Sequence, residues 1–171
     1  MTLTSFLPTL RESLPAPLDR DRWPAGARPT VRDVFLRGVS LVGYADLCGT
    51  PCVMTGDAII PLSGGVLSTK VAASAVVTSV TAVEFDGGIR AVQVDADLSG
   101  VEHVGSELRL LARVSHAHDA AWVIFDRHRA RIAIDAPALP VDLVPGDLLA
   151  LPCRGAISLS SLRPREDGRC S

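Results

Sequence analysis

Aromatic side chains and net charge are both low in this sequence, and each shortage argues against a class of partner. Aromatic residues make up 4% of the 171 positions, and the formal net charge is −2. Proteins that bind single-stranded nucleic acid combine a basic groove with stacked aromatic side chains, so an OB-like nucleic-acid binder ranks last among the functions considered. We therefore expect no nucleic-acid partner.

Long apolar runs are also missing. No run approaches the roughly 18 residues that are needed to span a bilayer, and the first residues lack the basic flank of a secretion signal. We expect no membrane partner and a cytoplasmic location. The hydrophobic fraction of 47% and the charged fraction of 21% are those of a globular chain rather than a disordered one.

Cysteine is scarce as well. Cys48, Cys52, Cys153 and Cys170 are too few and too scattered for a disulfide framework. Three residues separate Cys48 from Cys52, which is wider than a zinc knuckle, and no histidine or cysteine pair at ligand spacing completes a site. We expect no bound metal, and the sequence assigns no role to Cys48 or Cys52.

The segment from residue 70 to residue 84 is the longest run of strand-forming side chains. Its β-branched members are Val71, Val76, Val77, Thr78, Val80, Thr81 and Val83. Such side chains pack well on a pleated surface and lose rotamer freedom in a helix, so this segment predicts a strand. Asp86-Gly87-Gly88 then predicts a hairpin loop, and residues 89–96 predict the returning strand.

The region around Pro145-Gly146-Asp147 predicts a tight turn, because proline fixes φ and glycine accepts a positive φ. Residues 148–151 follow as a nearly all-apolar strand, which we expect to be buried on both faces. Gly155 allows a sharp bend. The alternation that begins at Ile157 predicts the start of another, half-buried strand.

The remaining predicted elements are short. We expect an amphipathic helix at residues 4–14, followed by a proline-rich arm to residue 29 in which Trp23 is the large apolar anchor. Residues 41–47 fit either a strand or one helical turn, and Gly56-Asp57 predicts a turn. Further short strands are predicted at residues 34–36, 52–54, 58–60, 108–114, 120–125 and 130–134.

These elements predict an all-β fold, a mostly antiparallel, Greek-key-like β-barrel with a short N-terminal helix. The expected organisation is the helix and arm over residues 1–30, a single barrel domain over residues 31–165, and a C-terminal tail over residues 166–171.

Several segments resemble one known family. The stretch from Leu139, with its Pro-Gly-Asp-Leu-Leu and Gly-Ala, resembles the end of the β-barrel domain of the pyridoxal-phosphate-dependent decarboxylases of the ornithine and diaminopimelate type, whose layout is similar to that of alanine racemases. Gly49-Thr50-Pro51 resembles the family's entry into its first barrel strand. Residues 76–80 and 92–96 resemble the strands that begin its C-terminal domain. The resemblance implies a β-barrel fold.

The family's cofactor residues do not carry over to this chain. In the family, an α/β barrel with the cofactor lysine lies between the two β segments, and 171 residues are too few for both parts. Ile157 stands where the family has a tyrosine after Gly-Ala, and no Gly-Pro-x-Cys motif is recognisable near residues 133–137. Lys70 follows Gly49-Thr50-Pro51 too closely for the cofactor lysine, and no glycine-rich phosphate loop accompanies it. We expect no cofactor.

Other candidate chemistry is local. His116 and His118 share a strand face and could form a metal or acid–base pair, although a solvated hairpin tip is the simpler interpretation. Asp95 and Asp97 could act as paired carboxylates, with solvated acids as the alternative. Lys70 is the only lysine among 17 basic residues. It could be a reserved amine, or the bias could reflect an arginine-rich codon usage.

Arginine is concentrated at one predicted turn. Arg127, Arg129 and Arg131 could hold a phosphate or carboxylate ligand, and a solvated turn explains them equally well.

Two functions follow as expectations. The first is a freestanding decarboxylase-type accessory or interaction protein without its own cofactor site, which forms a homodimer or completes a partner enzyme. The alternative is a small β-barrel enzyme or carrier, of the cyclase or isomerase type, that holds an apolar molecule in an interior cavity above about 300 Å³. No sequence motif selects a reaction.

Overall fold

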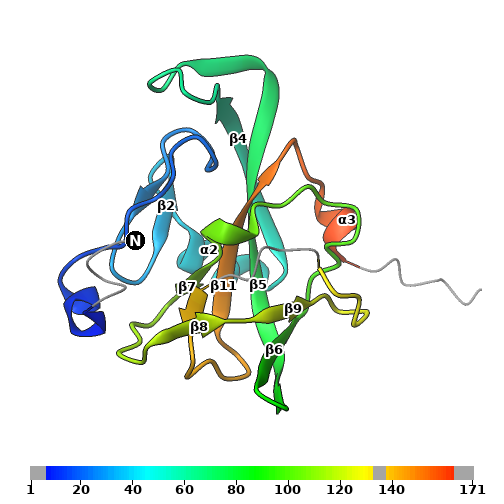
Figure 1. Cartoon of the computed structure of the whole chain (residues 1–171). Coiled ribbons are helices and arrows are strands. Elements are labelled where there is room, and N and C mark those ends of the chain that lie inside the picture. The colour runs from blue at the N-terminus through cyan, green and yellow to red at the C-terminus, as the bar shows by residue number, and fades with distance from the viewer. Residues whose placement is uncertain (1–6, 133–137, 164–171) are drawn as a thin grey trace, which may run out of the picture.

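One long strand organises the fold of this protein. The computed structural model describes residues 7–132 and 138–163, and within them β5 (Leu67–Asp86) pairs with three other strands. Strand β4 (Cys52–Ile59) is antiparallel to its first half, β6 (Ile89–Val94) is antiparallel to its second half, and β11 (Leu148–Arg154) is antiparallel to residues 73–79. Figure 1 shows β5 running through the whole molecule. The predicted strand and its hairpin with residues 89–94 are confirmed.

The predicted turn before β11 is confirmed too. Gly146 has a φ of +95°, and the amide of Asp147 donates to the carbonyl of Val144. The chain then enters β11, where Leu149, Ala150 and Leu151 are all buried, as the apolar composition predicts. Strand β7 (Arg109–Leu111) pairs antiparallel with the other edge of β11.

The main sheet is mixed, and no closed barrel forms within residues 7–132 and 138–163. The strand order is β7-β11-β5-β6-β9, and the end strands β7 and β9 (Val123–Phe125) do not pair with each other. Strand β9 runs parallel to β6, so the expectation of an antiparallel barrel holds only at the level of a mostly β fold. Among the described strands of this sheet, β7 pairs with β11 and β9 pairs with β6, so the sheet ends at these two strands instead of closing.

Shorter elements surround this sheet. They are η1 (Pro8–Glu12), the meander β1 (Arg28–Pro29), β2 (Val34–Leu36) and β3 (Val39–Ser40), α2 (Leu41–Cys48), η2 (Gly105–Glu107), the pair β8 (Asp119–Ala121) and β10 (Ala138–Pro140), and α3 (Leu159–Leu162). No helix in the described ranges is long and apolar enough to cross a membrane.

The two faces of the sheet bury separate apolar clusters. Val76 and Leu149 belong to one cluster, whereas their sequence neighbours Val77 and Ala150 belong to the other, because alternate side chains of a strand point to opposite faces. Trp23 is 1% exposed and lies in the second cluster. The N-terminal segment (residues 7–29) is therefore docked on the sheet through the anchor that the sequence indicated.

Several predicted elements differ in the structure. Gly56 and Asp57 continue strand β4 instead of forming a turn. A Cβ at Gly56 would lie 3.3 Å from the Cβ of Pro24, so glycine at this position lets the N-terminal segment approach the strand. Residues 159–162 form the helical turn α3 rather than a strand, which buries Leu162 completely in the first cluster.

Other differences concern element length. Of the predicted N-terminal helix, residues 1–6 lie outside the described ranges, and within the described part residues 8–12 are helical, as a 3₁₀ turn. The predicted strand at residues 108–114 shortens to β7, and residues 120–125 divide between β8 and β9, which pair with different partners. Residues 41–47 take the helical alternative, with Ser40 Oγ accepting from the amide of Gly43. Of the strand predicted at residues 130–134, residue 131 forms a single bridge with Phe125 and residues 133–134 lie outside the description.

Candidate functional site

The end of the β4–β5 hairpin exposes an apolar surface. We define the hairpin tip as residues 60–71, which Figure 1 shows projecting beyond the rest of the sheet. Its exposed apolar side chains are Ile60, Leu62, Val66, Leu67 and Val71, whose exposed fractions run from 45% to 97%. Lys70 is the single charged residue of the tip. Large exposed apolar side chains gathered on one segment are often found at interaction sites.

Local hydrogen bonds hold the tip in one conformation. The amide of Ile60 donates to the carbonyl of Val66 at 2.8 Å, and Ser68 Oγ accepts from the amides of Lys70 and Val71. The amide of Leu62 donates to the carboxylate of Asp21 in the N-terminal segment at 2.8 Å. The exposed side chains are thus presented by an ordered backbone, which lowers the entropy lost on binding.

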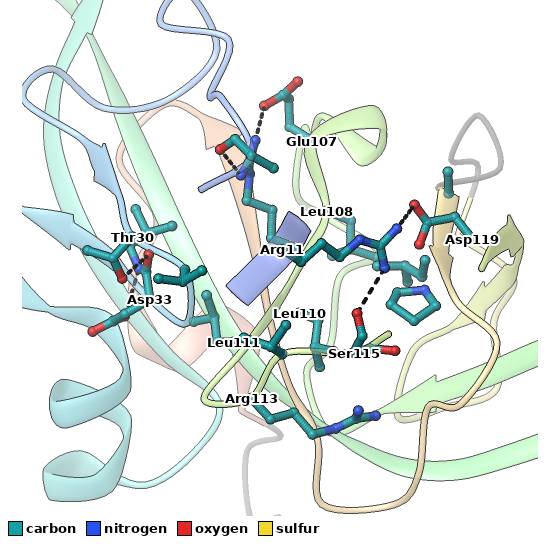
Figure 2. Close-up of a pocket in the computed structure, with 18 of the residues that line it drawn as sticks. Arg11, Thr30, Asp33, Glu107, Leu108, Leu110, Leu111, Arg113, Ser115 and Asp119 are labelled. Atoms are coloured by element: carbon teal, nitrogen blue, oxygen red, sulfur yellow. Dashed lines mark hydrogen bonds and ion pairs between the residues drawn. The ribbon is translucent and has the colours of Figure 1, made fainter. Parts of the chain in front are cut away.

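A second feature is a cavity of about 320 Å³ between the N-terminal segment and strand β7. Its walls come from residues 11–17, from the β1–β2 connection, from residues 106–115 and from β10. Leu108, Leu110 and Leu111 contribute apolar surface, and Figure 2 shows the guanidinium of Arg11 reaching Asp119 and the backbone at Ser115. The size matches the sequence-based expectation, but the cavity lies beneath the N-terminal segment rather than inside a barrel, and charged groups line it.

The charged groups around the cavity are paired. Arg11 contacts Asp119 at 2.5 Å, and Arg113 makes two hydrogen bonds of 2.7 Å to Asp147, which is buried. The hydrogen bonds to Asp147 are the main cause that raises the pKa of Arg113 above its ordinary value. The cavity therefore holds balanced charge and has no evident preference for an ionic ligand.

Among the charged residues that line the cavity, Arg109 has one nitrogen without a hydrogen-bond partner in the described part of the chain. Its two terminal nitrogens donate to the carbonyls of Ala16 and Pro17, and Glu107 lies 3.9 Å away. Its Nε is buried and has no hydrogen-bond partner among the described residues. Burial lowers the pKa of Arg109, an effect that Glu107 partly opposes.

Asp95 and Asp97, the predicted carboxylate pair, have separate partners. Asp95 accepts hydrogen bonds from Thr50 Oγ1 and Thr78 Oγ1, each at 2.5 Å, and from the amide of Ser79 at 3.0 Å. Asp97 accepts from the side chain and amide of Ser99, whose hydroxyl is the main cause of the lowered pKa of Asp97. Asp95 thus joins β5 and β6 to the entry of β4, and Asp97 closes a local turn.

The predicted histidine pair is placed near the surface. His116 Nε2 lies 3.0 Å from Glu12 Oε1, and the side chain of His118 is exposed. Lys70 is exposed on the hairpin tip and is not among the residues that line the cavity.

The predicted arginine cluster lies at an exposed turn. Arg129 has a φ of +60° and pairs with Glu84 at 2.9 Å, and the backbone of Arg127 hydrogen-bonds with Ala96 and Gln93. Arg131 is exposed as well. The three residues are not among those that line the cavity of about 320 Å³.

The described cysteines show no metal-type grouping. Cys52 and Cys153 are buried, and burial is the main cause that raises the pKa of Cys52 to about 11 and that of Cys153 to about 12. Cys48 is exposed. Within the described ranges, no three His, Cys, Asp or Glu side chains gather at metal-binding distance. Cys170 lies outside those ranges.

Sequence reasoning missed both the hairpin tip and the cavity. The tip had a signal in the sequence, an apolar segment around Gly64-Gly65 with a single charge, but apolar residues more often indicate burial. The cavity had none, because its walls come from four separate parts of the chain.

Comparison with known proteins finds similarity of structure only. No protein-family model and no curated protein sequence matches the chain. Among solved structures, the arginine decarboxylase of Paramecium bursaria Chlorella virus matches with 18% identity and a TM-score of 0.41, over 53% of this chain and 28% of the enzyme. A diaminopimelate decarboxylase matches with 20% identity and a TM-score of 0.39, over 52% of this chain and 26% of that one. The matched part is about half of this chain and about a quarter of the length of these enzymes.

Proposed function

We propose that this protein is an interaction protein that pairs with a second copy of itself through the hairpin tip. The observation that carries the proposal is the exposure of five apolar side chains on one ordered hairpin end, with Leu62 97% exposed. Leaving such side chains in water forgoes the free energy of their burial, about 25 cal/mol for each Å² of apolar surface.

The tip carries too little charge to select an unlike partner by charge complementarity. Charge patterns select specific partners and exclude others, and the tip has Lys70 as its single charge. A two-fold contact requires only that one surface be complementary to itself, and it buries the same five side chains on both copies. Lys70 is an exposed residue of β5, so its side chain can stay solvated at the rim of the contact.

The rigidity of the tip supports the same proposal. Its backbone amides at Ile60 and Val71 have local acceptors, so no segment has to fold when the contact forms. The loss of conformational entropy is therefore small, and a modest apolar contact is enough for weak self-association. The expected dissociation constant is about 10 μM, as for interfaces at the lower end of the size range.

Sedimentation velocity over a range of concentrations tests this proposal. We expect the wild-type chain to convert from monomer to dimer as its concentration passes through the micromolar range, and Leu62→Asp to stay monomeric because each copy would bury an unpaired carboxylate. Leu47→Asp is the matched control, since Leu47 is 84% exposed on α2 and outside the tip.

The control variant should dimerise like the wild type. A wild-type chain that stays monomeric at hundreds of micromolar would contradict the proposal. The proposal would also be contradicted if the Leu47→Asp variant were monomeric while the Leu62→Asp variant still formed dimers.

A further inference from the structure

Two cysteines lie at the ends of one short connection. Helix α2 ends at Cys48, strand β4 begins at Cys52, and three residues connect them. Nη2 of Arg163 donates to the carbonyl of Cys48 and to the carbonyl of Pro51, each at 3.3 Å. Because one nitrogen atom contacts both ends of the connection, the chain forms a closed turn there, and the two cysteines that flank the turn lie close together.

The side chains of the two cysteines also influence each other. Burial is the main cause that raises the pKa of Cys52 to about 11, and the charge of Cys48 adds to this effect. Such an electrostatic effect weakens with distance, so the two sulfur atoms are near each other. A disulfide requires Cα atoms about 4–7 Å apart, a separation within reach of a closed turn of this length.

The two thiols differ in exposure. Cys48 is exposed, so a reagent in solution reaches its sulfur, whereas Cys52 is 1% exposed and is reached only from within the protein. An accessible thiol with a second thiol beside it is the arrangement that exchanges with disulfides in solution. We propose that Cys48 and Cys52 form a thiol–disulfide exchange site that takes a small disulfide as its substrate. The site lies at the α2–β4 turn and includes none of the hairpin-tip residues.

The exchange takes place in two steps. The thiolate of Cys48 attacks one sulfur of the small disulfide, forms a mixed disulfide with it and releases the other half as a thiolate. The thiolate of Cys52 then attacks Cys48 Sγ, forms the Cys48–Cys52 disulfide and releases the second half. The two protein thiols are oxidised, and the small disulfide is reduced to two thiols that take up the two protons. The positive charge of Arg163 opposes the effect of burial and favours the thiolate of Cys52.

The other two cysteines provide internal references. Cys153 belongs to the first apolar cluster and Cys52 to the second, so the main sheet separates them. We therefore expect Cys153 to stay reduced while the chain is folded. Cys170 lies outside the described residues, and the variant Cys170→Ser removes it as a competing partner.

Peptide mapping by mass spectrometry tests the inference on the folded, full-length chain. The reduced protein is incubated with oxidised glutathione, and samples are quenched with acid at intervals. We expect glutathione to appear first on Cys48. A Cys48–Cys52 disulfide should follow, which carries no glutathione and has two hydrogen atoms fewer than the reduced chain. Cys170→Ser should give the same two products in the same order.

Two variants separate the steps. Cys52→Ala keeps a small apolar side chain in the core and should accumulate glutathione on Cys48 without further conversion. Cys48→Ser changes an exposed position and should lose both products, because glutathione does not reach Cys52. Circular dichroism shows whether each variant is folded like the wild type.

Several results would overturn the inference. These are a Cys48 that stays unmodified, glutathione that remains on Cys48 of the wild type, and a disulfide that joins Cys48 to Cys170 or to a second copy of the chain. Reaction of Cys52 in the folded Cys48→Ser variant would overturn it as well. A monomeric wild type in the hairpin-tip experiment would not affect it, since the turn and the hairpin tip share no residue.

Discussion

Replacing Arg113 with methionine is expected to lower the free energy of unfolding by about 2–3 kcal/mol, because it leaves the buried carboxylate of Asp147 without its counter-charge, although the guanidinium itself is partly exposed. Arg113 Nε and Nη2 each donate to the carboxylate of Asp147 at 2.7 Å, and the side chain of Asp147 is 6% exposed. The guanidinium of Arg113 also donates to the carboxylate and to the backbone carbonyl of Asp142. Methionine retains the aliphatic part of the side chain and removes the positive charge.

The effect reaches the main sheet through the turn before β11. Asp147 accepts from the amide of Val144, and its own carbonyl accepts from the amide of Val80 in β5. Denaturant unfolding of Arg113→Met and of Arg154→Met measures the difference. Arg154 pairs with Glu102 at an exposed site, so Arg154→Met should lower the free energy of unfolding by less than about 1 kcal/mol. Equal losses in the two variants would show that the buried pair has no special importance.

The contact between Arg113 and Asp142 predicts a dependence on pH. Burial tends to raise the pKa of Asp142, but hydrogen bonds from Ser115 and Arg113 outweigh it, and the pKa lies below its ordinary value. Since the folded pKa is lower than the unfolded one, the stabilisation is complete above about pH 4 and is lost as the pH falls through the lowered value. Arg113→Met should therefore lose less stability than the wild type on acidification, in unfolding experiments at a series of pH values.

Replacing Asp95 with alanine is expected to lower the free energy of unfolding by about 3 kcal/mol. The substitution removes the acceptor for Thr50 Oγ1, Thr78 Oγ1 and the amide of Ser79, and each buried donor left without a partner costs about 1 kcal/mol or more. Because Asp95 links the end of β6 to the entry of β4, both strands should lose protection against hydrogen exchange.

The neighbouring carboxylate provides the control for Asp95. Asp97 accepts from Ser99, two residues away, and lies within 3.6 Å of an exposed histidine. Asp97→Ala should therefore cost about 1 kcal/mol or less and leave the exchange of β4 amides unchanged. If Asp97→Ala proved as destabilising as Asp95→Ala, the assignment of Asp95 as the link between the strands would be wrong.

The parts of the fold that depend on local sequence were predictable. The β-branched residues around Val76 and Val77 indicate a strand in any context, and Asp86-Gly87-Gly88 indicates its hairpin. The turn at Gly146 follows from proline, glycine and aspartate in sequence. Each of these elements is confirmed, because its stability depends mainly on neighbouring residues.

The parts that depend on distant contacts were not predictable. Gly56 indicates a turn by its type, but the approach of Pro24 explains why glycine is present in a continuous strand. The parallel pairing of β9 with β6 has no local signal, and it separates the observed mixed sheet from the expected barrel. Asp95 was a candidate acid, yet its partner Thr50 is 45 residues away. The residue type of Leu62 gives no signal of exposure, and only the topology shows that this side chain lies in solvent at the hairpin tip.

Chemical cross-linking at Lys70 tests the proposed self-association most directly, because Lys70 is the only lysine of the chain and lies on the hairpin tip. A short reagent that joins two amines, followed by mass spectrometry, should give a Lys70–Lys70 link between two copies, and Leu62→Asp should abolish that link while Leu47→Asp retains it. Sedimenting dimers without a Lys70–Lys70 link, or a link that persists in Leu62→Asp, would contradict pairing through the hairpin tip.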